Sequence, residues 1–233
     1  MTNRPGNRVN STVLADPRWS SPGAASLVYP SRHPLVAHKL ATLRDKDTPP
    51  ATFRRLVREV AALLAYEALA DLLTKPVDVP TPLGPCPSRR LAETMAIVPI
   101  LRAGLGMADG VLDLVPEAEV WHIGLYRDEA TLQPMEYYNK LHGRCRVDLA
   151  LVVDPMLATG GSAIHACRLV RGTGATRIKL VSLIAAPEGI ARFQAVFPDV
   201  PIYVGAVDER LTKVGFIYPG LGDAGDRQFG TMG

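Results

Sequence analysis

Five apolar runs, separated by segments of helical length, constrain the fold of this chain most strongly. They are MAIVPIL, EVWHIGLY, LALVV, IKLVSLIAA and PIYVGAV, at residues 95–101, 119–126, 149–153, 178–186 and 201–207. Several are continuously apolar, which is typical of strands that are buried on both faces of a sheet. The helix-length segments between them are 104–114, 162–171 and 187–197. Strands that alternate with helices predict an α/β fold with a mostly parallel sheet flanked by helices.

An amphipathic helix is predicted ahead of this sheet, over residues 53–73. Its apolar side chains recur at helical spacing, at Leu56, Val60, Leu63, Leu64 and Leu72. Thr48 or Thr52 is a candidate N-cap, and the pair Lys75-Pro76 is expected to end the helix. Residues 76–90 then hold five prolines and one glycine, which indicates a turn-rich connection or a short hairpin.

Residues 1–28 are polar and rich in Pro, Ser, Asn and Arg, so we expect a flexible N-terminal extension followed by one domain over 29–233. The net charge of +3 is spread over well-mixed acidic and basic residues, which argues against a general nucleic-acid surface. No apolar run reaches membrane-spanning length, and the first residues lack the apolar centre of a signal peptide. The three cysteines are widely spaced, as expected in a reducing compartment. These features predict a cytoplasmic protein.

The stretch LVVDPMLATGGSA, residues 151–163, has the features of a phosphate site. An apolar run ends at Asp154, and a loop of small residues leads to Gly160, Gly161 and Ser162, where a helical pattern begins. Unhindered backbone N–H groups and the positive end of a helix favour an anion. The loop lacks the Lys-Ser/Thr ending of a Walker A motif, and an ordinary strand-to-helix turn capped by Ser162 is the structural alternative.

Two glycine-rich segments resemble the dinucleotide fingerprint only superficially. In GLGMADG, residues 104–110, the third glycine is one position too late, and GLGDAG, residues 220–225, lies too near the end of the chain for a βαβ unit to follow. A tight loop whose backbone approaches a flat ligand explains the second segment better.

Two arginines and the histidines bear on the ligand. Arg102 and Arg127 each follow a predicted strand, at the edge where parallel sheets bind ligands, so their guanidinium groups can clamp phosphate oxygens. Taken alone, each arginine fits a surface salt bridge better, and their joint position at this edge favours the functional interpretation. The five histidines show no metal-binding spacing, and a protein-bound metal is not predicted.

The sequence resembles the uracil phosphoribosyltransferase family. The segments VVDPMLATGGS, HPLVAHKLATLRD, VPILRAGLGMADG, HIGLYRDEATLQP, YYNKL and GFIYPGLGDAGDRQFGT match it in order, from about residue 28 to the end. The resemblance implies a phosphoribosyltransferase-type sheet, an N-terminal helical segment and a C-terminal hood that binds the base. It implies transfer of a phosphoribosyl group from 5-phosphoribosyl pyrophosphate (PRPP) to uracil, giving UMP and pyrophosphate in pyrimidine salvage.

The resemblance also implies which residues bind the two substrates. Asp154 would hold the ribose hydroxyls, the loop to Ser162 the 5-phosphate, and both arginines the pyrophosphate. Asp223 would face both substrates and serve as the catalytic residue. The implied PRPP residues are Arg102, Arg127, Asp154, Pro155, Met156, Leu157, Ala158, Thr159, Gly160, Gly161, Ser162 and Asp223. The implied uracil residues are Ile217, Gly222, Asp223 and Ala224.

The remaining implications concern cofactors, partners and alternatives. Mg²⁺ is expected to arrive with PRPP rather than in a protein cage. A homodimer or larger homo-oligomer is expected, and GTP is a candidate activator because it activates some family members. Pro155 fits the uracil branch, whereas Tyr218 stands where a small aliphatic residue is usual and can reshape the base pocket. A purine phosphoribosyltransferase and a non-catalytic regulator that senses UMP and binds RNA are the alternatives.

Overall fold

The computed structural model describes residues 27–127, 134–139, 141 and 147–231. Its elements in chain order are β1 (Val28–Pro30), α1 (Pro34–Arg44), α2 (Pro50–Ala68), β2 (Thr74–Thr81), β3 (Gly84–Leu91), β4 (Met95–Leu101), α3 (Leu105–Leu112), β5 (Glu119–Val120), β6 (Ile123–Arg127), β7 (Pro134–Asn139), β8 (Leu149–Val153), β9 (Met156–Leu157), α4 (Gly161–Thr173), β10 (Arg177–Ala185), α5 (Pro187–Val196), β11 (Ile202–Val207), β12 (Arg210–Leu211), β13 (Ile217–Tyr218) and α6 (Ala224–Phe229).

One sheet organises the described residues, with its main strands in the order β1-β11-β10-β8-β4-β6-β7. All of these strands pair in parallel except β7, which returns antiparallel to β6. The predicted α/β class is therefore confirmed. The apolar runs 95–101 and 149–153 became β4 and β8 without change, whereas the run 119–126 divides into β5 and β6.

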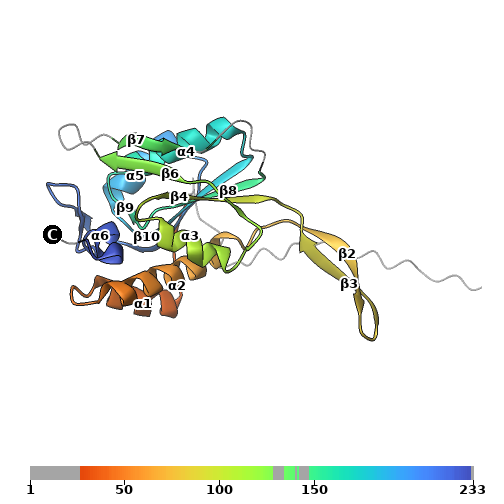
Figure 1. Ribbon diagram of the computed structural model, residues 1–233. Coiled ribbons are helices and arrows are strands. Elements are labelled where there is room, and N and C mark those ends of the chain that lie inside the picture. The colour runs from red at the N-terminus through yellow and green to blue at the C-terminus, as the bar shows by residue number, and fades with distance from the viewer. Residues whose placement is uncertain (1–26, 128–133, 140, 142–146, 232–233) are drawn as a thin grey trace, which may run out of the picture.

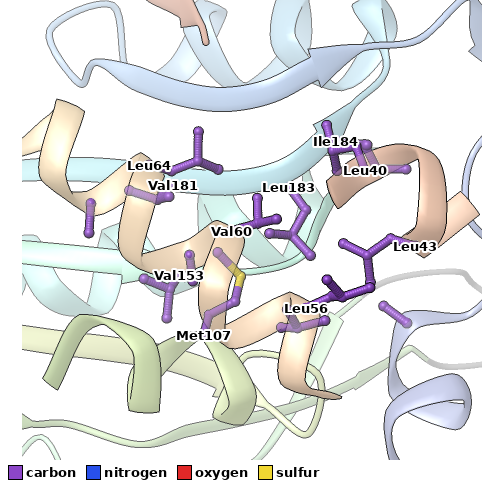
Figure 2. Packing of buried hydrophobic residues seen from close by; sticks show 14 of the residues in the cluster. Leu40, Leu43, Leu56, Val60, Leu64, Met107, Val153, Val181, Leu183 and Ile184 are labelled. Carbon is purple, nitrogen blue, oxygen red and sulfur yellow. The ribbon is translucent and has the colours of Figure 1, made fainter. Parts of the chain in front are cut away.

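Helices cover both faces of this sheet, as Figure 1 shows: α1, α2 and α3 lie on one side and α4 and α5 on the other. Each face of the sheet packs into its own hydrophobic core. Alternate strand residues belong to one core or the other, because successive side chains of a strand point to opposite faces. In β8, Leu151 and Val153 join the core under α2, and Ala150 and Val152 join the core under α4. Figure 2 shows the α2 core, where residues of α2 meet Val153, Val181 and Leu183 of β8 and β10.

The predicted helix over 53–73 exists, but both of its predicted boundaries were wrong. Pro49 is the N-cap and provides no side-chain cap, while the Thr48 hydroxyl instead donates to the Thr42 carbonyl at the end of α1. The helix ends at Ala68, and the Ala68 carbonyl accepts a hydrogen bond from the Lys179 ammonium. Lys75-Pro76 does not end it and lies in β2.

Residues 74–91 form a long hairpin, β2–β3, that projects from the body of the protein (Figure 1). This confirms the predicted hairpin and extends it to eight residues in each strand. Its tip residue Leu83 is fully exposed. We call this hairpin the arm.

Several elements were not predicted. Helix α1 buries Val36, Leu40 and Leu43 against the sheet, and α6 follows the glycine-rich segment near the end of the chain. The expected extension over 1–28 lies outside the described residues as far as residue 26 and stays a prediction, but Val28 already begins β1 and pairs with Ile202. Among the described helices, none is long and apolar enough to cross a membrane.

Candidate functional site

A cavity of about 630 Å³ lies beyond the carboxyl ends of β4 and β8. Its lining comes from four separate segments and consists of Ala103, Asp154, Met156, Ala158, Val214, Gly215, Phe216, Asp223, Ala224 and Gly225. A smaller pocket of about 30 Å³ shares Asp154, Met156 and Ala158 with it and continues along residues 159–163. The position agrees with the rule that parallel sheets bind ligands at the carboxyl ends of their strands.

The smaller pocket is formed by the loop that the sequence predicts to bind phosphate, and α4 begins in it. Gly160 is the N-cap residue with φ +77°, a left-handed conformation that glycine adopts without strain. The cap provides no side-chain hydrogen bond, and the first turn carries no acidic residue. The N–H groups and the positive dipole at this helix end are therefore oriented for an anion the size of a phosphate.

Asp154 lies between the two pockets, directly after β8. Its backbone N–H donates to the Val181 carbonyl at 3.2 Å, which holds the residue against β10. Burial raises the pKa of its carboxyl from 3.8 to about 7; the Met156 N–H, 3.4 Å from Oδ1, opposes this shift, and the negative charge of Asp223 adds to it. The carboxyl group is therefore poised to ionise when hydroxyl groups or a cation approach it.

The loop from Pro155 to Leu157 fixes the position of Asp154. The Pro155 carbonyl accepts hydrogen bonds from Leu183 and Ile184 of β10, at 3.0 and 3.1 Å. Leu157 is 1% exposed and packs into the α4 core. Of the predicted PRPP residues, these two anchor the loop to the body of the protein, while Met156 and Ala158 line the large cavity.

Asp223 reaches the same cavity from the other end of the sequence. It is the N-cap of α6, and its Oδ1 accepts the Asp226 N–H at 2.9 Å. Ala224 and Gly225 line the cavity beside it. The structure thus brings the two predicted acids, which are far apart in sequence, to one cavity.

Arg102 follows β4 at the same edge of the sheet. Its Nη2 donates to Asp226 Oδ1 at 3.1 Å, and its guanidinium carbon lies 5.7 Å from the centre of the Phe229 ring. The side chain remains half exposed, so a polyanion can reach it. Arg127 is the last residue of β6, and its side chain lies outside the described part of the structure.

The predicted uracil residues lie in or beside the C-terminal segment that we call the hood, which comprises β12, β13 and the base loop at residues 219–224. Ile217 is 5% exposed and packs in the core, and Gly222 precedes Asp223 with φ +77°. Tyr218 points the other way from Ile217, is 44% exposed, and lies 4.3 Å under the Arg210 guanidinium. Tyr218 is not among the residues that line the cavity, and its effect on the base pocket stays a prediction.

Sequence reasoning assigned no role to four of the cavity-lining residues, Ala103, Val214, Gly215 and Phe216, and placed Gly225 only in the glycine-rich loop expected to approach a flat ligand. All are small or apolar, and none carries a chemical group that marks a site. Phe216 had the only usable signal, a flat ring close to the acid-bearing loop. Its ring provides an apolar wall suited to a planar ligand.

The described residues offer two carboxylates, Asp154 and Asp223, to a cation in the cavity. Within this part of the chain no cluster of three or more His, Cys, Asp or Glu residues could hold a metal ion. Two carboxylates suit a Mg²⁺ ion that takes its remaining ligands from water and a pyrophosphate.

A loop of small residues at a helix N-terminus, an acid at the preceding strand end and a hooded cavity on a parallel sheet define the class of phosphoribosyltransferase-type folds. The chain belongs to the uracil phosphoribosyltransferase family, because the family model described as Uracil phosphoribosyltransferase matches residues 30–231.

Individual relatives agree with this assignment. The chain is 57% identical over 201 residues to the uracil phosphoribosyltransferase of Roseiflexus sp. (strain RS-1), covering 86% of this chain and 97% of that protein. It is 55% identical to the protein of that name from Halalkalibacterium halodurans, covering 88% and 99%. The solved structure of AQ2163 protein from Aquifex aeolicus is similar, with a TM-score of 0.83 and 41% identity, covering 87% of this chain and 97% of that one.

Proposed function

We propose that this chain catalyses the reaction of uracil with PRPP to give UMP and pyrophosphate, a step of pyrimidine salvage. The observation that carries the proposal is the meeting of Asp154 and Asp223 at one cavity that continues into the phosphate loop. Family membership supports it.

In this reaction the bond from the anomeric carbon to pyrophosphate breaks, and a bond from that carbon to uracil N1 forms as N1 loses its proton. The sugar passes through an oxocarbenium-like state, so catalysis depends on positioning and on charge stabilisation. The loop of residues 155–162 would hold the 5-phosphate and Asp154 the ribose hydroxyls. Arg102 and Arg127 would bind the departing pyrophosphate, and Asp223 would face both substrates.

The base loop is suited to read a pyrimidine. Backbone groups around Ile217, Gly222 and Ala224 can match the alternating donors and acceptors of uracil. Cytosine would be rejected, because its amino group places a donor where uracil has an acceptor and leaves a buried group unpaired.

Mg²⁺ is the cofactor that this proposal requires. Asp154 and Asp223 are the residues that would hold it, as their position on the cavity wall supports. When bound with PRPP, the ion would neutralise charge on the pyrophosphate.

A homo-oligomer is part of the proposal, and the arm supports it. An isolated two-stranded hairpin is only marginally stable in water, and Leu83 at the tip is fully exposed. A second copy of the chain that covers the arm would remove this exposure. A measurement of mass in solution tests this point, and a monomer at micromolar concentration would contradict it.

A cytoplasmic location and activation by GTP complete the proposal. Cys86 is exposed and Cys167 is buried, and both are free thiols, as suits a reducing compartment. UMP formation measured with and without GTP tests the activation.

The deciding experiment is a base panel with PRPP and Mg²⁺. We expect UMP and pyrophosphate from uracil, with cytosine, hypoxanthine and guanine at background. Turnover of a purine but not of uracil would identify a purine enzyme instead. Failure to form UMP together with tight RNA binding would identify a regulator.

A further inference from the structure

We propose that Arg44, Asp208 and Arg227 position the base loop and so set the affinity for the base, although none of them lines the cavity. The inference rests on the proposed function and extends it to α1, a helix that carries none of the predicted site residues. It concerns positioning residues, which act through the backbone of the loop rather than by touching a substrate.

Arg44 and Asp208 form a two-pronged ion pair beneath the loop. The Arg44 guanidinium donates to both Asp208 oxygens, at 2.7 and 2.5 Å, and also to the Gly220 carbonyl at 2.8 Å. Asp208 in turn accepts the Gly220 N–H at 2.9 Å. Both backbone groups of Gly220 are thereby fixed by charged partners, and the Asp208 side chain is only 5% exposed.

Gly220 is suited to this arrangement. Its φ of +67° is left-handed, and an added Cβ would come within 2.1 Å of the Ile217 carbonyl oxygen. The loop can therefore make its turn here only with glycine. The direction in which residues 222–224 leave the turn is consequently determined by how Gly220 is held.

Arg227 holds the next residue of the loop. Its Nη1 donates to the Leu221 carbonyl at 2.7 Å and to the Leu43 carbonyl at 2.6 Å, and its Nη2 donates to the Asp45 carbonyl. The guanidinium carbon also lies 4.5 Å from the centre of the Phe53 ring. A buried guanidinium thus links the base loop to the last carbonyls of α1. Such carbonyls at the end of a helix have no intrahelical partners.

These contacts occupy the N–H and carbonyl of Gly220 and the carbonyl of Leu221, and their side-chain partners do not line the cavity. The following residues, Asp223 and Ala224, then face the cavity in one fixed orientation. A preorganised loop binds its ligand more tightly, because less ordering is required on binding. Loosening the loop is therefore expected to weaken uracil binding while leaving the distant phosphate loop intact.

The test measures separate KM values for uracil and PRPP, with kcat, for R44M, R44K and R227K. The matched control is R177M: Arg177 Nη2 donates to both oxygens of Glu93, whose side chain is 8% exposed, at the opposite edge of the sheet. We expect R44M to raise the KM for uracil about 10- to 100-fold, as displacement of a positioning group does. We expect its KM for PRPP to change by less than about threefold. In R44K and R227K, which keep the positive charge, we expect a KM for uracil between those of the wild type and R44M.

R177M should lose thermal stability with both KM values unchanged. The proposal is overturned if folded R44M keeps the wild-type KM for uracil, or if both KM values rise equally in R44M and R177M. Should R44M fail to fold, the same criteria apply to R44K and to D208N, whose amide can still accept the Gly220 N–H. Absence of uracil turnover in the wild type would instead refute the proposed function.

Discussion

The two edges of the parallel sheet arrange their charges in opposite ways. At the amino edge, Arg177 bridges Glu93 and Asp71, and the buried Lys179 ammonium donates to Asp71 at 2.5 Å. At the carboxyl edge, Asp154 and Asp223 share one cavity, and burial, with a smaller contribution from the Asp223 charge, raises the pKa of Asp154. The charges named at the amino edge are neutralised within the fold, whereas Asp154 at the carboxyl edge keeps an electrostatic cost that a ligand or cation can relieve. The paired charges that stabilise the fold in this comparison thus lie at the amino ends of the strands, and the acids of the proposed site lie at the carboxyl ends.

The largest effect is expected from D223N. Asparagine caps helices as well as aspartate does, so α6 should form normally, while the charge that we propose faces both substrates is lost. We expect kcat/KM to fall about 100-fold or more, as when one stabilising polar group is removed from an active site. Steady-state kinetics measures this loss, and circular dichroism checks that the variant is folded.

The control is D148N at the amino edge, where Asp148 accepts the Thr94 N–H and hydroxyl. Its turnover should stay near that of the wild type. Equal losses in both variants would break the comparison.

A smaller and more selective effect is expected from G161V. Gly161 begins α4 in the phosphate loop, and a β-branched side chain would crowd the anion site. The KM for PRPP should rise about tenfold or more, the equivalent of losing one charge-assisted hydrogen bond. The KM for uracil should change little. G172V serves as the control, since an added Cβ at Gly172, near the other end of α4, meets nothing within 4 Å. A parallel loss of both affinities in G161V would indicate a folding defect.

The most gradual effect is expected from pH, through Asp154. In the unfolded chain this carboxyl titrates near 3.8 and in the folded protein near 7, so the folded state holds an extra proton between those values. The stability contributed by that proton is present at low pH and is lost as pH rises through this window. Because ribose hydroxyls donate to a carboxylate, PRPP affinity should rise with pH up to about 7, by at most about tenfold per pH unit. Calorimetric titration should show this slope in the wild type and a flatter one in D154N. Identical slopes would contradict the role of Asp154.

The sequence predicted the parts of the site whose chemistry lies in one continuous segment. Asp154 and the loop to Ser162 are such a segment, and the strand, loop and helix follow each other as expected. Asp223 was linked to them only through the family resemblance. Phe216 and Val214 were missed because an apolar residue at a cavity wall looks like any other apolar residue in sequence.

The fold was predictable wherever periodicity was long. Strand β8 and the central part of α2 matched their patterns, but the ends of α2 did not, and one of them contacts a residue distant in sequence, Lys179 at Ala68. Helix α1 had a usable signal, since Val36, Leu40 and Leu43 recur at helical spacing, but the run is short. The joining of α1 to the base loop by Arg44 and Arg227 could not be foreseen, because it depends on tertiary contacts.

The composition of the arm restricts how another protein can associate with it. Four prolines lie within its two strands, at positions 76, 80, 85 and 87. Proline has no N–H to donate, so an incoming strand could not complete a continuous hydrogen-bonded ladder along the arm. The exposed strand edges are thereby protected from the edge-to-edge pairing that leads to aggregation. A partner must instead recognise the side chains of the arm, and such recognition can be specific where strand addition would not be.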